Sequence, residues 1–384
     1  MSIPRAYQRC VRCVMDTTDT LIAFSSSGEC NHCSDYIANR LSATPYSSSY
    51  QASSNLSLSN FFNKIKSKSS KRSSHDVLVG VSGGVDSSSV VLLAQKAGLR
   101  VLAVHMDNCW NTPIAVQNIY KLLNLSGVDY FCEVLDWNNF KKVQRAFFLS
   151  GVADLELPTD IAIQAVLHRV AHQYGIKVIL SGGNIASEGI LPSTWLYNAR
   201  DSLYSKSILL SAGIPVATFN QLSFGLRSEV FYRLFSRIKT LYPLNLYPYD
   251  KQVARHDLIN AISWVSYGGN HCESIFTRFA HLIYLPRRHN IDYRLASLSA
   301  NICLGKVSRT DALEQLKLPP WEGINVSSDM HFVAAKLGFT FAELERLTNS
   351  PGRYYFDYPN RQHLLSCIYQ VYRCLNGTKK LSNF

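Results

Sequence analysis

The stretch Val81-Ser82-Gly83-Gly84-Val85-Asp86-Ser87-Ser88 decides the fold of this chain. It follows a compact β-branched run, Asp76 to Val81, that is typical of a buried parallel strand, and a helical pattern continues from it to Ala97. Its two glycines let the backbone turn tightly and approach an anion closely. The free N–H groups and the dipole of the following helix favour negative charge. The stretch therefore predicts a phosphate-binding loop, whose hydroxyl donors are Ser82, Ser87 and Ser88.

The acidic residue of this loop, Asp86, indicates a metal ion. A carboxylate would repel a bare phosphate at this distance, so we expect Mg²⁺ to bridge the two. The loop lacks the lysine of the Walker motif and the GxGxxG spacing of dinucleotide-binding folds. The pattern SGGxDSS after a strand instead resembles the signature of the PP-loop, or ATP-pyrophosphatase, families. An ordinary serine-rich turn is the alternative, and the order of strand, loop and helix disfavours it.

Strand-like and helix-like patterns alternate after this loop. We expect strands at Leu99 to Met106, Asp129 to Leu135 and Val178 to Leu180, and helices at Pro113 to Leu123 and Ile161 to Tyr174. This alternation predicts an α/β fold with a doubly wound parallel sheet, which binds ligands at the carboxyl ends of its strands. The residues expected to contact ATP are Val81, Ser82, Gly83, Gly84, Asp86, Ser87, Ser88, His105, Asp107, Gly182 and Gly183.

Acidic residues near those strand ends are candidates for catalysis. Asp86 and Glu188 are the expected Mg²⁺ ligands, and Glu188 follows the second pair of glycines. Asp160 stands just before a predicted helix, so a role as N-cap is as good an interpretation as a catalytic one. Asp107 is either a nucleotide contact or a solvated loop carboxylate.

Four of the ten cysteines form two CxxC pairs near the N-terminus, namely Cys10, Cys13, Cys30 and Cys33. Thiolates at this spacing predict a closed, structural Cys₄ zinc site, similar to a zinc ribbon, on a segment too short for its own core. Unpaired buried thiols and an iron–sulfur cluster are the alternatives. His32 lies between two of the cysteines, and we interpret it as a bystander.

Four segments can be separated along the 384 residues. Residues 1–40 are the cysteine-rich module. Residues 41–75 are a serine-rich linker with a short helix from Leu56 to Ile65. Residues 76–249 are the PP-loop domain. Residues 250–384 read as mainly helical and are expected to bind substrate or a partner.

The net charge of +12 favours an anionic ligand. The basic residues are scattered, which favours a small anionic substrate over nucleic acid. No apolar run is long enough to cross a bilayer, and the first ten residues lack the apolar core of a signal peptide. We therefore expect a cytoplasmic protein with no membrane contact.

Several motifs together resemble one family, the N-acetyl sugar amidotransferases of bacterial surface-polysaccharide pathways, within the PP-loop superfamily. The resemblance covers the cysteine module, the phosphate loop and three further segments, which are His105 to Asn111, Leu155 to Asp160 and Ser181 to Pro192. Its most specific motif runs from Tyr267 to Phe279, because other PP-loop enzymes lack it. This chain departs from the family pattern at Cys109, Asn270, Leu295 and Ser297.

The resemblance implies an ATP-dependent reaction. The acetamido oxygen of a nucleotide-linked sugar would take AMP from ATP and release pyrophosphate, and ammonia would then displace AMP to leave an acetamidino sugar. The chain shows no glutaminase nucleophile, and the resemblance implies that a separate glutaminase and barrel synthase, similar to those of histidine biosynthesis, deliver ammonia. The expected donors to the sugar substrate are Lys206, His271, Arg278, Arg287 and Arg288, and a solvated or structural role is the alternative for each.

Two other functions compete with this one. A PP-loop tRNA-modifying enzyme, such as a thiolation enzyme or a lysidine-type ligase, would suit the basic charge and the cysteine pairs, with Cys109 as a sulfur carrier. A non-catalytic scaffold of a polysaccharide assembly is the other, and the intact phosphate loop disfavours it.

Overall fold

The computed structural model describes residues 6–41, 54–69, 73–267 and 272–376. Its centre is a five-stranded sheet in the order β3-β2-β1-β4-β5, in which all neighbouring strands are parallel. The strands are β1 (Val77–Gly80), β2 (Val101–Asp107), β3 (Asp129–Val134), β4 (Val178–Leu180) and β5 (Lys239–Leu241). The predicted doubly wound parallel sheet is therefore confirmed.

The first four strands agree with the sequence prediction, but β5 was not predicted. This strand is only three residues long, and its residues are exposed or half-buried at the edge of the sheet. An edge strand of this kind lacks the apolar run that marks a buried strand. Its position is fixed by backbone pairing with β4.

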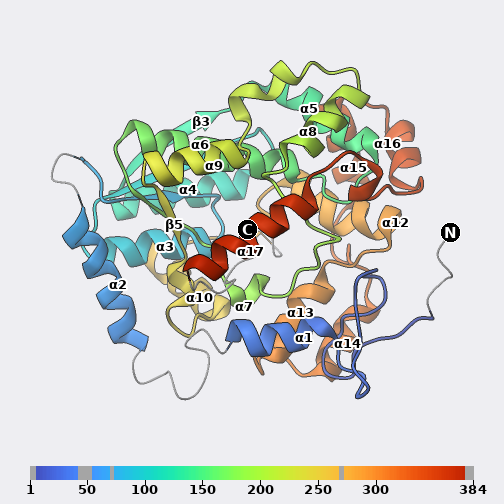
Figure 1. Ribbon diagram of the computed structural model, residues 1–384, viewed down its shortest axis with the longest axis horizontal. Coiled ribbons are helices and arrows are strands. Elements are labelled where there is room, and N and C mark those ends of the chain that lie inside the picture. Colours follow the sequence, from blue (N-terminus) through green and yellow to red (C-terminus); the bar gives the residue numbers. More distant parts are fainter. Residues whose placement is uncertain (1–5, 42–53, 70–72, 268–271, 377–384) are drawn as a thin grey trace.

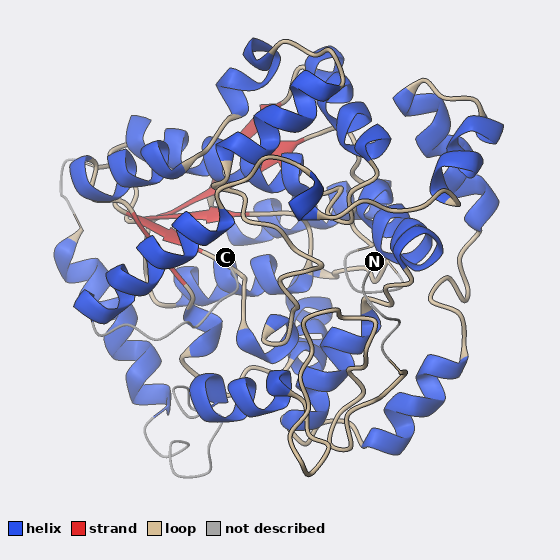
Figure 2. Ribbon diagram, turned by 45° about the vertical axis from the view of Figure 1, so that its right-hand side comes forward, coloured by secondary structure: helices blue, strands red, loops and turns tan. Residues whose placement is uncertain are grey.

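Helices cover both faces of the sheet (Figures 1 and 2). On one face, residues such as Val79 and Ala103 pack with Phe62 and Val90 in one buried cluster. On the other face, Leu78 and Leu102 belong to a larger cluster that also includes the cysteine module and C-terminal helices. The α-helices that contribute buried residues to the first cluster are α2 (Ser54–Lys68), α3 (Val85–Lys96), α4 (Pro113–Ser126) and α10 (Lys251–Ile262).

The predicted helices are present, although their bounds differ. The helix at Leu56 to Ile65 is part of α2, and the helix at Ile161 to Tyr174 begins earlier, as α6 (Leu157–Gln173). A further helix, α5 (Trp137–Ser150), packs on the larger core with its buried Phe140 and Phe147. The short helices between β4 and β5 are α7 (Ile185–Glu188), α8 (Ser202–Ser211), η4 (Val216–Leu222), α9 (Leu226–Val230) and η5 (Phe231–Phe235), and η6 (Pro243–Asn245) follows β5.

The C-terminal part is helical, as predicted, and the cysteine module lies against it. Figure 1 shows α1 (Asn31–Asp35) beside α13 (Arg294–Cys303) and α14 (Arg309–Lys317). The π-helical turn η1 (Tyr36–Arg40) follows α1. The other elements are α11 (Ile275–Phe279), η7 (Ala280–Tyr284), α12 (Leu285–His289), α15 (Val326–Leu337), α16 (Phe341–Thr348), η8 (Tyr355–Asp357) and α17 (Gln362–Asn376). Within the described ranges, no helix combines the length and apolar character needed to span a membrane.

Candidate active site

A cavity of about 190 Å³ opens at the carboxyl end of the central strand β1. This volume suits phosphate groups better than a whole nucleotide, since pockets for drug-sized ligands are larger. The neighbours of β1 are β2 and β4, so the loops after β1 and β4 border a crevice of the kind that binds ligands in open parallel sheets. The cavity is lined by Ser82, Gly84, Val85, Asp86, Ser87, Gly182, Glu188, Lys251, Tyr267 and Glu273.

The backbone of the phosphate loop depends on two glycines. Gly83 has a φ of +81°, and a Cβ there would come within 2.4 Å of the Ala115 carbonyl oxygen. The carbonyl oxygen of Gly83 accepts a hydrogen bond of 3.0 Å from Nε1 of the buried Trp264. Gly182, in the loop after β4, packs so closely that a Cβ would lie 2.9 Å from the backbone nitrogen of Ser87. The loop after β4 therefore packs directly against the phosphate loop after β1, and each limits the movement of the other.

We expect Gly182→Ala to weaken ATP use on the order of 10–100-fold, because the added methyl group would displace the backbone that faces the phosphates. Activity can be followed as pyrophosphate release, and thermal melting separates a local effect from unfolding. Gly225→Ala is the matched control, because a Cβ at Gly225 meets its nearest atom at an ordinary 3.4 Å. Equal losses in the two variants would contradict the role assigned to this close approach.

Asp86, on the first turn of α3, is held from two sides. Its Oδ2 forms an ion pair of 3.0 Å with Nζ of Lys251, and its Oδ1 accepts a hydrogen bond of 2.5 Å from the hydroxyl of Tyr249. Both partners come from the segment around the start of α10. Lys306 extends the connection, since its Nζ contacts the Tyr249 carbonyl oxygen and the carboxylate of Asp250.

Two further carboxylates, Glu188 and Glu273, complete the acidic side of the cavity. Burial and the neighbouring Asp86 raise the pKa of Glu188 to about 7. Oε2 of Glu273 is shielded from solvent and has no hydrogen-bond partner among the described residues. Its Oε1 lies 3.5 Å from the position of a Cβ on Gly84. The acids thus surround the turn on which phosphate is expected.

These carboxylates fit a magnesium ion that binds together with phosphate. Mg²⁺ in such sites takes one or two carboxylates and substrate phosphate oxygens rather than a cage of protein ligands. One or two of Asp86, Glu188 and Glu273 would hold it, and the unsatisfied oxygen of Glu273 is the observation that favours a cation here. The ion would neutralise charge on the departing pyrophosphate.

The predicted ATP contacts occupy different positions. Ser82, Gly84, Asp86, Ser87 and Gly182 line the cavity. Gly83, Gly183 and Val81 are part of the loops that form it, whereas the Ser88 hydroxyl is fully buried without a partner among the described residues.

His105 and Asp107 organise the loop after β2. Nδ1 of His105 lies 2.7 Å from the Val81 carbonyl oxygen, and its Nε2 lies 3.0 Å from Nδ2 of Asn111. Oδ1 of Asp107 accepts hydrogen bonds from the backbone nitrogen of Cys109 and from Asn111. Both side chains therefore support the loop from within, and the prediction that they touch the nucleotide stays untested.

Asp160 is not an N-cap. The helix α6 starts at Leu157 and its N-cap residue is Glu156, so Asp160 lies inside the first turn. Burial and the carboxylates of Asp154, Glu156 and Glu188 raise the pKa of Asp160 well above its usual range. Asp160 does not line the cavity.

The basic residues predicted to bind the sugar substrate lie elsewhere. Arg278 forms a two-point ion pair with Asp329, at 2.7 and 2.6 Å. Arg287 stacks on Trp321, and Arg288 stacks on Tyr284 and donates to the Pro351 carbonyl oxygen. Lys206 is exposed on α8. None of these four lines the cavity, and His271 lies outside the described residues.

Sequence reasoning missed Tyr249, Lys251 and Glu273 as site residues. Tyr267 and Glu273 belong to the motif Tyr267 to Phe279, which lies in the region that was expected to bind substrate or a partner. The backbone shows why the motif reaches the ATP side: the nitrogen of Thr112 donates to the Glu273 carbonyl oxygen, and Asn111 pairs with Ser274. Nothing in the local sequence around Lys251 indicates an ion pair with a residue 165 positions earlier.

The four cysteines form a compact cluster of thiols. The sulfur atoms of Cys10, Cys13, Cys30 and Cys33 all lie within 4.8 Å of one another and are fully buried. The Sγ–Sγ distances are 3.9 Å between Cys10 and Cys33 and 3.7 Å between Cys13 and Cys30. A tetrahedral ion with Zn–S bonds of about 2.3 Å requires edges of about 3.8 Å. The cluster therefore fits a single zinc ion, whereas an iron–sulfur cluster would hold the thiolates further apart.

Groups around the cluster support this interpretation. Nε2 of His32 is engaged by Asp19 at 2.7 Å, so His32 is a bystander as expected. The guanidinium of Arg309 donates to the carbonyl oxygens of Cys10 and Cys13. A fifth thiol, Cys303, lies 3.7 Å from the sulfur of Cys33 but is not part of the four-membered set.

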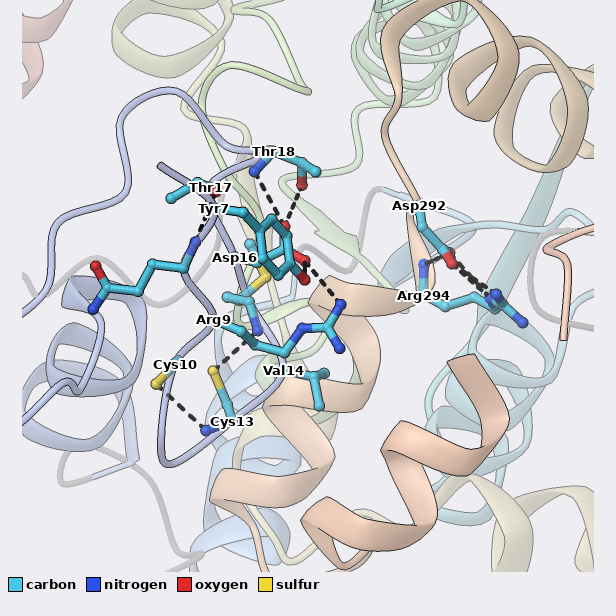
Figure 3. A network of polar contacts seen from close by, with 12 residues as sticks. Tyr7, Arg9, Cys10, Cys13, Val14, Asp16, Thr17, Thr18, Asp292 and Arg294 are labelled. Atoms are coloured by element: carbon cyan, nitrogen blue, oxygen red, sulfur yellow. Dashed lines mark hydrogen bonds and ion pairs between the residues drawn. The ribbon is translucent and has the colours of Figure 1, made fainter. Parts of the chain in front are cut away.

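A polar network holds the N-terminal loop of the module (Figure 3). The buried Asp16 accepts hydrogen bonds from Tyr7, Arg9 and Thr18. The backbone nitrogen of Val14 donates to Ser299 on α13. The module is thus fixed to the C-terminal helices rather than free to move as a separate unit.

Two protein families match this chain. The NAD synthase family matches residues 57–135, and a domain described as "LPS biosynthesis protein WbpG-like, C-terminal domain" matches residues 273–374. A comparison with curated proteins gave no match. The second match begins at Glu273, the residue whose side chain enters the cavity.

Solved structures with a similar fold are distant. U34-tRNA thiolase NcsA from Methanococcus maripaludis, with its 4Fe-4S cluster, has 11% identity and a TM-score of 0.32 over 68% of this chain and 80% of its own. NMN synthetase from Francisella tularensis has 15% identity and a TM-score of 0.30, and the match covers 57% of this chain and 98% of its own. NH3-dependent NAD synthetase from Campylobacter jejuni has 14% identity and a TM-score of 0.30, and the match covers 56% of this chain and 93% of its own. At these scores the similarity says nothing about this chain's substrate.

The sheet order, the phosphate loop and the first family match define a PP-loop protein with a NAD synthase-like, ATP-binding domain. Proteins of this class use ATP with Mg²⁺. The second match adds a C-terminal region of the WbpG-like type found in lipopolysaccharide biosynthesis. Together they confirm the resemblance to the N-acetyl sugar amidotransferases that the sequence motifs indicated.

Proposed function

We propose that this protein is an ATP-dependent amidotransferase acting on a nucleotide-linked N-acetyl sugar in the cytoplasm. The acetamido oxygen attacks the α-phosphate of ATP, pyrophosphate leaves, and ammonia then displaces AMP to give an acetamidino sugar. The observation that carries the proposal is the cavity itself, in which the WbpG-like segment contributes Glu273 to a PP-loop site. The phosphate loop and the segment similar to a lipopolysaccharide-biosynthesis protein thus line the same cavity.

The residues of the chain have separable roles in this proposal. The backbone from Ser82 to Ser87 receives the β- and γ-phosphates, with the N-terminus of α3 behind it. Lys251, paired with Asp86, brings positive charge to the same cavity and can shift toward a phosphate oxygen when ATP binds. The chemistry is favourable because an amide oxygen is a poor leaving group and AMP is a good one.

We further propose that ammonia comes from a separate glutaminase and barrel-synthase pair. Free ammonia is mostly protonated to ammonium at neutral pH, and ammonium has no electron pair with which to attack. Purified enzyme alone should therefore respond to ammonium salts most strongly at alkaline pH, and a reconstituted trio should use glutamine at neutral pH.

The direct test uses mass spectrometry of UDP- and CMP-linked acetamido sugars incubated with enzyme, ATP, Mg²⁺ and ammonia. The expected product differs by about one mass unit and carries a new basic centre, and AMP and pyrophosphate appear in equal amounts. Release of ADP and orthophosphate, or no ATP use with any acetamido sugar, would exclude the proposed reaction.

A thiolating, tRNA-modifying role is less well supported. Burial and the nearby Asp107 raise the pKa of the Cys109 thiol, which disfavours the thiolate that sulfur transfer needs. Cys109 also adopts a φ of +65°, in the loop that Asp107 closes. Full activity of Cys109→Ser would count further against sulfur transfer, and tRNA binding with a steep salt dependence would count for it.

A further inference from the structure

A half-buried lysine from the C-terminal region reaches the loop that follows β2. Lys336 lies on α15, within the segment that matches the WbpG-like domain, and its Nζ donates a hydrogen bond to the carbonyl oxygen of Cys109. Within the described residues, this ammonium group contacts a carbonyl oxygen and aromatic rings rather than a carboxylate. The lysine thus links the WbpG-like segment to the PP-loop domain at a point away from the cavity.

Three aromatic rings surround the ammonium group of Lys336. Its Nζ lies 4.9 Å from the centres of the Trp110 and Trp137 rings and 5.4 Å from the centre of the Phe332 ring. Phe332 is one turn earlier on α15, Trp137 begins α5, and Trp110 belongs to the loop after β2. An aromatic face attracts a cation at such distances. The three rings therefore hold the ammonium group in one place.

The residue that receives this hydrogen bond has a strained backbone. Cys109 has a φ of +65°, in the left-handed region that residues other than glycine avoid, because Cβ there crowds a carbonyl oxygen. Its backbone nitrogen donates to Oδ1 of Asp107 at 2.7 Å, and its carbonyl oxygen accepts from Lys336. Such a conformation persists only where the surrounding contacts enforce it. Asp107 and Lys336 supply these contacts on the two sides of Cys109.

The loop that contains the strained residue supports the cavity at two points. Nδ2 of Asn111 lies 3.0 Å from Nε2 of His105, and Nδ1 of His105 lies 2.7 Å from the carbonyl oxygen of Val81. The backbone nitrogen of Thr112 donates to the carbonyl oxygen of Glu273 at 2.8 Å. Val81 leads directly into the phosphate loop, and Glu273 lines the cavity. The conformation of the loop after β2 therefore affects the positions of both.

We propose that Lys336 is a positioning residue for ATP. By holding Cys109 in its left-handed conformation, the lysine keeps the phosphate loop and Glu273 in the arrangement that receives ATP and Mg²⁺. Lys336 does not line the cavity, so it acts through the loop and not by contact with the nucleotide. The role rests on the ATP-binding part of the proposed function and does not depend on which sugar is the substrate.

The first test replaces the lysine by methionine, which keeps an unbranched apolar side chain and removes the ammonium group. We expect the dissociation constant of Lys336→Met for α,β-methylene-ATP, measured by calorimetry with excess Mg²⁺, to rise about tenfold, because strain at one left-handed residue is worth about this factor. Amide hydrogen exchange at residues 107–112 should become faster in the same variant. Lys336→Arg keeps a cation that stacks on aromatic rings, so it should bind the analogue within about threefold of the wild-type protein.

A second substitution separates positioning from general packing. Cys109→Gly removes the strain, because glycine adopts a positive φ freely. In the Cys109→Gly protein, the further change Lys336→Met should alter the dissociation constant less than about twofold, since the lysine then has no strain to oppose. A lysine that only packs α15 against the rest of the protein would cause the same loss with cysteine or with glycine at position 109.

The matched control is Arg145→Met on α5. The guanidinium of Arg145 lies 3.8 Å from the centre of the Phe339 ring and donates to the carbonyl oxygen of Leu337 at 3.0 Å. This variant therefore loosens the contact between α5 and the end of α15, and it leaves Lys336 and its three rings in place. We expect it to bind the ATP analogue within about twofold of the wild-type protein.

The outcomes separate this role from the proposed function. No binding of the analogue by the wild-type protein would remove the proposed function, and the role of Lys336 with it. Normal binding by the wild-type protein and by Lys336→Met, or equal losses in Lys336→Met and Arg145→Met, would overturn the role of the lysine alone. If Lys336→Met does not fold, Phe332→Leu removes one exposed ring and keeps the lysine. It should raise the dissociation constant by a smaller factor, and an unchanged value would overturn the role equally.

Discussion

Asp86→Asn is expected to lower ATP turnover on the order of 10²–10³-fold, the largest kinetic effect that we predict for one side chain. The carboxylate lies at the start of α3 in the cavity wall, where it is the natural ligand for the ion that accompanies ATP. An amide of the same shape cannot supply the negative charge. It also leaves Lys251 without its ion pair, so the orientation of this lysine in the cavity wall changes too.

The measurement is pyrophosphate release over a range of Mg²⁺ concentrations. A ligand role predicts that excess Mg²⁺ recovers part of the activity of Asp86→Asn. The control is Asp250→Asn, which removes a carboxylate from the same neighbourhood and breaks the ion pair with Lys306 but does not line the cavity. If Asp250→Asn were as inactive as Asp86→Asn, the effect would belong to the position of α10 and not to the metal.

Loss of the metal from the cysteine cluster should have the largest effect on stability. One zinc ion per chain is expected, and Cys30→Ser should abolish its binding and lower the unfolding free energy by several kcal/mol, because metal binding is folding energy for such a module. Elemental analysis and thermal melting, with and without a chelator, measure both. Cys303→Ser is the matched control, since this thiol lies 3.7 Å from Cys33 but outside the set of four. Iron with sulfide in place of zinc would contradict the single-ion geometry.

Loss of the metal from the cysteine cluster should also disturb the active site. The hydroxyl of Tyr36, just after the last cysteine, donates to the Ile185 carbonyl oxygen at 2.9 Å, and a Cβ on Gly189 would collide with the Tyr36 ring. The helix between these two contacts, α7, ends with Glu188. A partly unfolded module would therefore release Glu188 from the cavity, and activity should fall before the sheet melts.

Local sequence patterns predicted the sheet, the phosphate loop and the cysteine cluster because each arises from neighbouring residues. The strand–loop–helix order around Gly83 needs no distant contact, and the CxxC spacing brings its own ligands together. The cavity wall is different, because Lys251 and Glu273 reach Asp86 and Gly84 only through the packing of α10 and the pairing of Ser274 with Asn111.

The basic residues show a related limit of sequence reasoning. Arg278 was an attractive phosphate donor by its charge, but its guanidinium is satisfied by Asp329, which lies 51 residues further along the chain. A sequence shows which groups carry charge, and only the fold shows which of those charges are already neutralised.

The short bridge between Asn111 and Ser274 has a practical meaning for anyone who wishes to divide this protein. The WbpG-like family match begins at residue 273, but the protein cannot be divided at this position without loss of structure. A shortened chain ending before that point would keep the nucleotide loop but lose one wall of its own pocket. It would also expose Trp110, which is fully buried and stacked on Phe276. Exchange of sugar specificity between relatives should therefore be attempted by transplanting single side chains rather than whole halves.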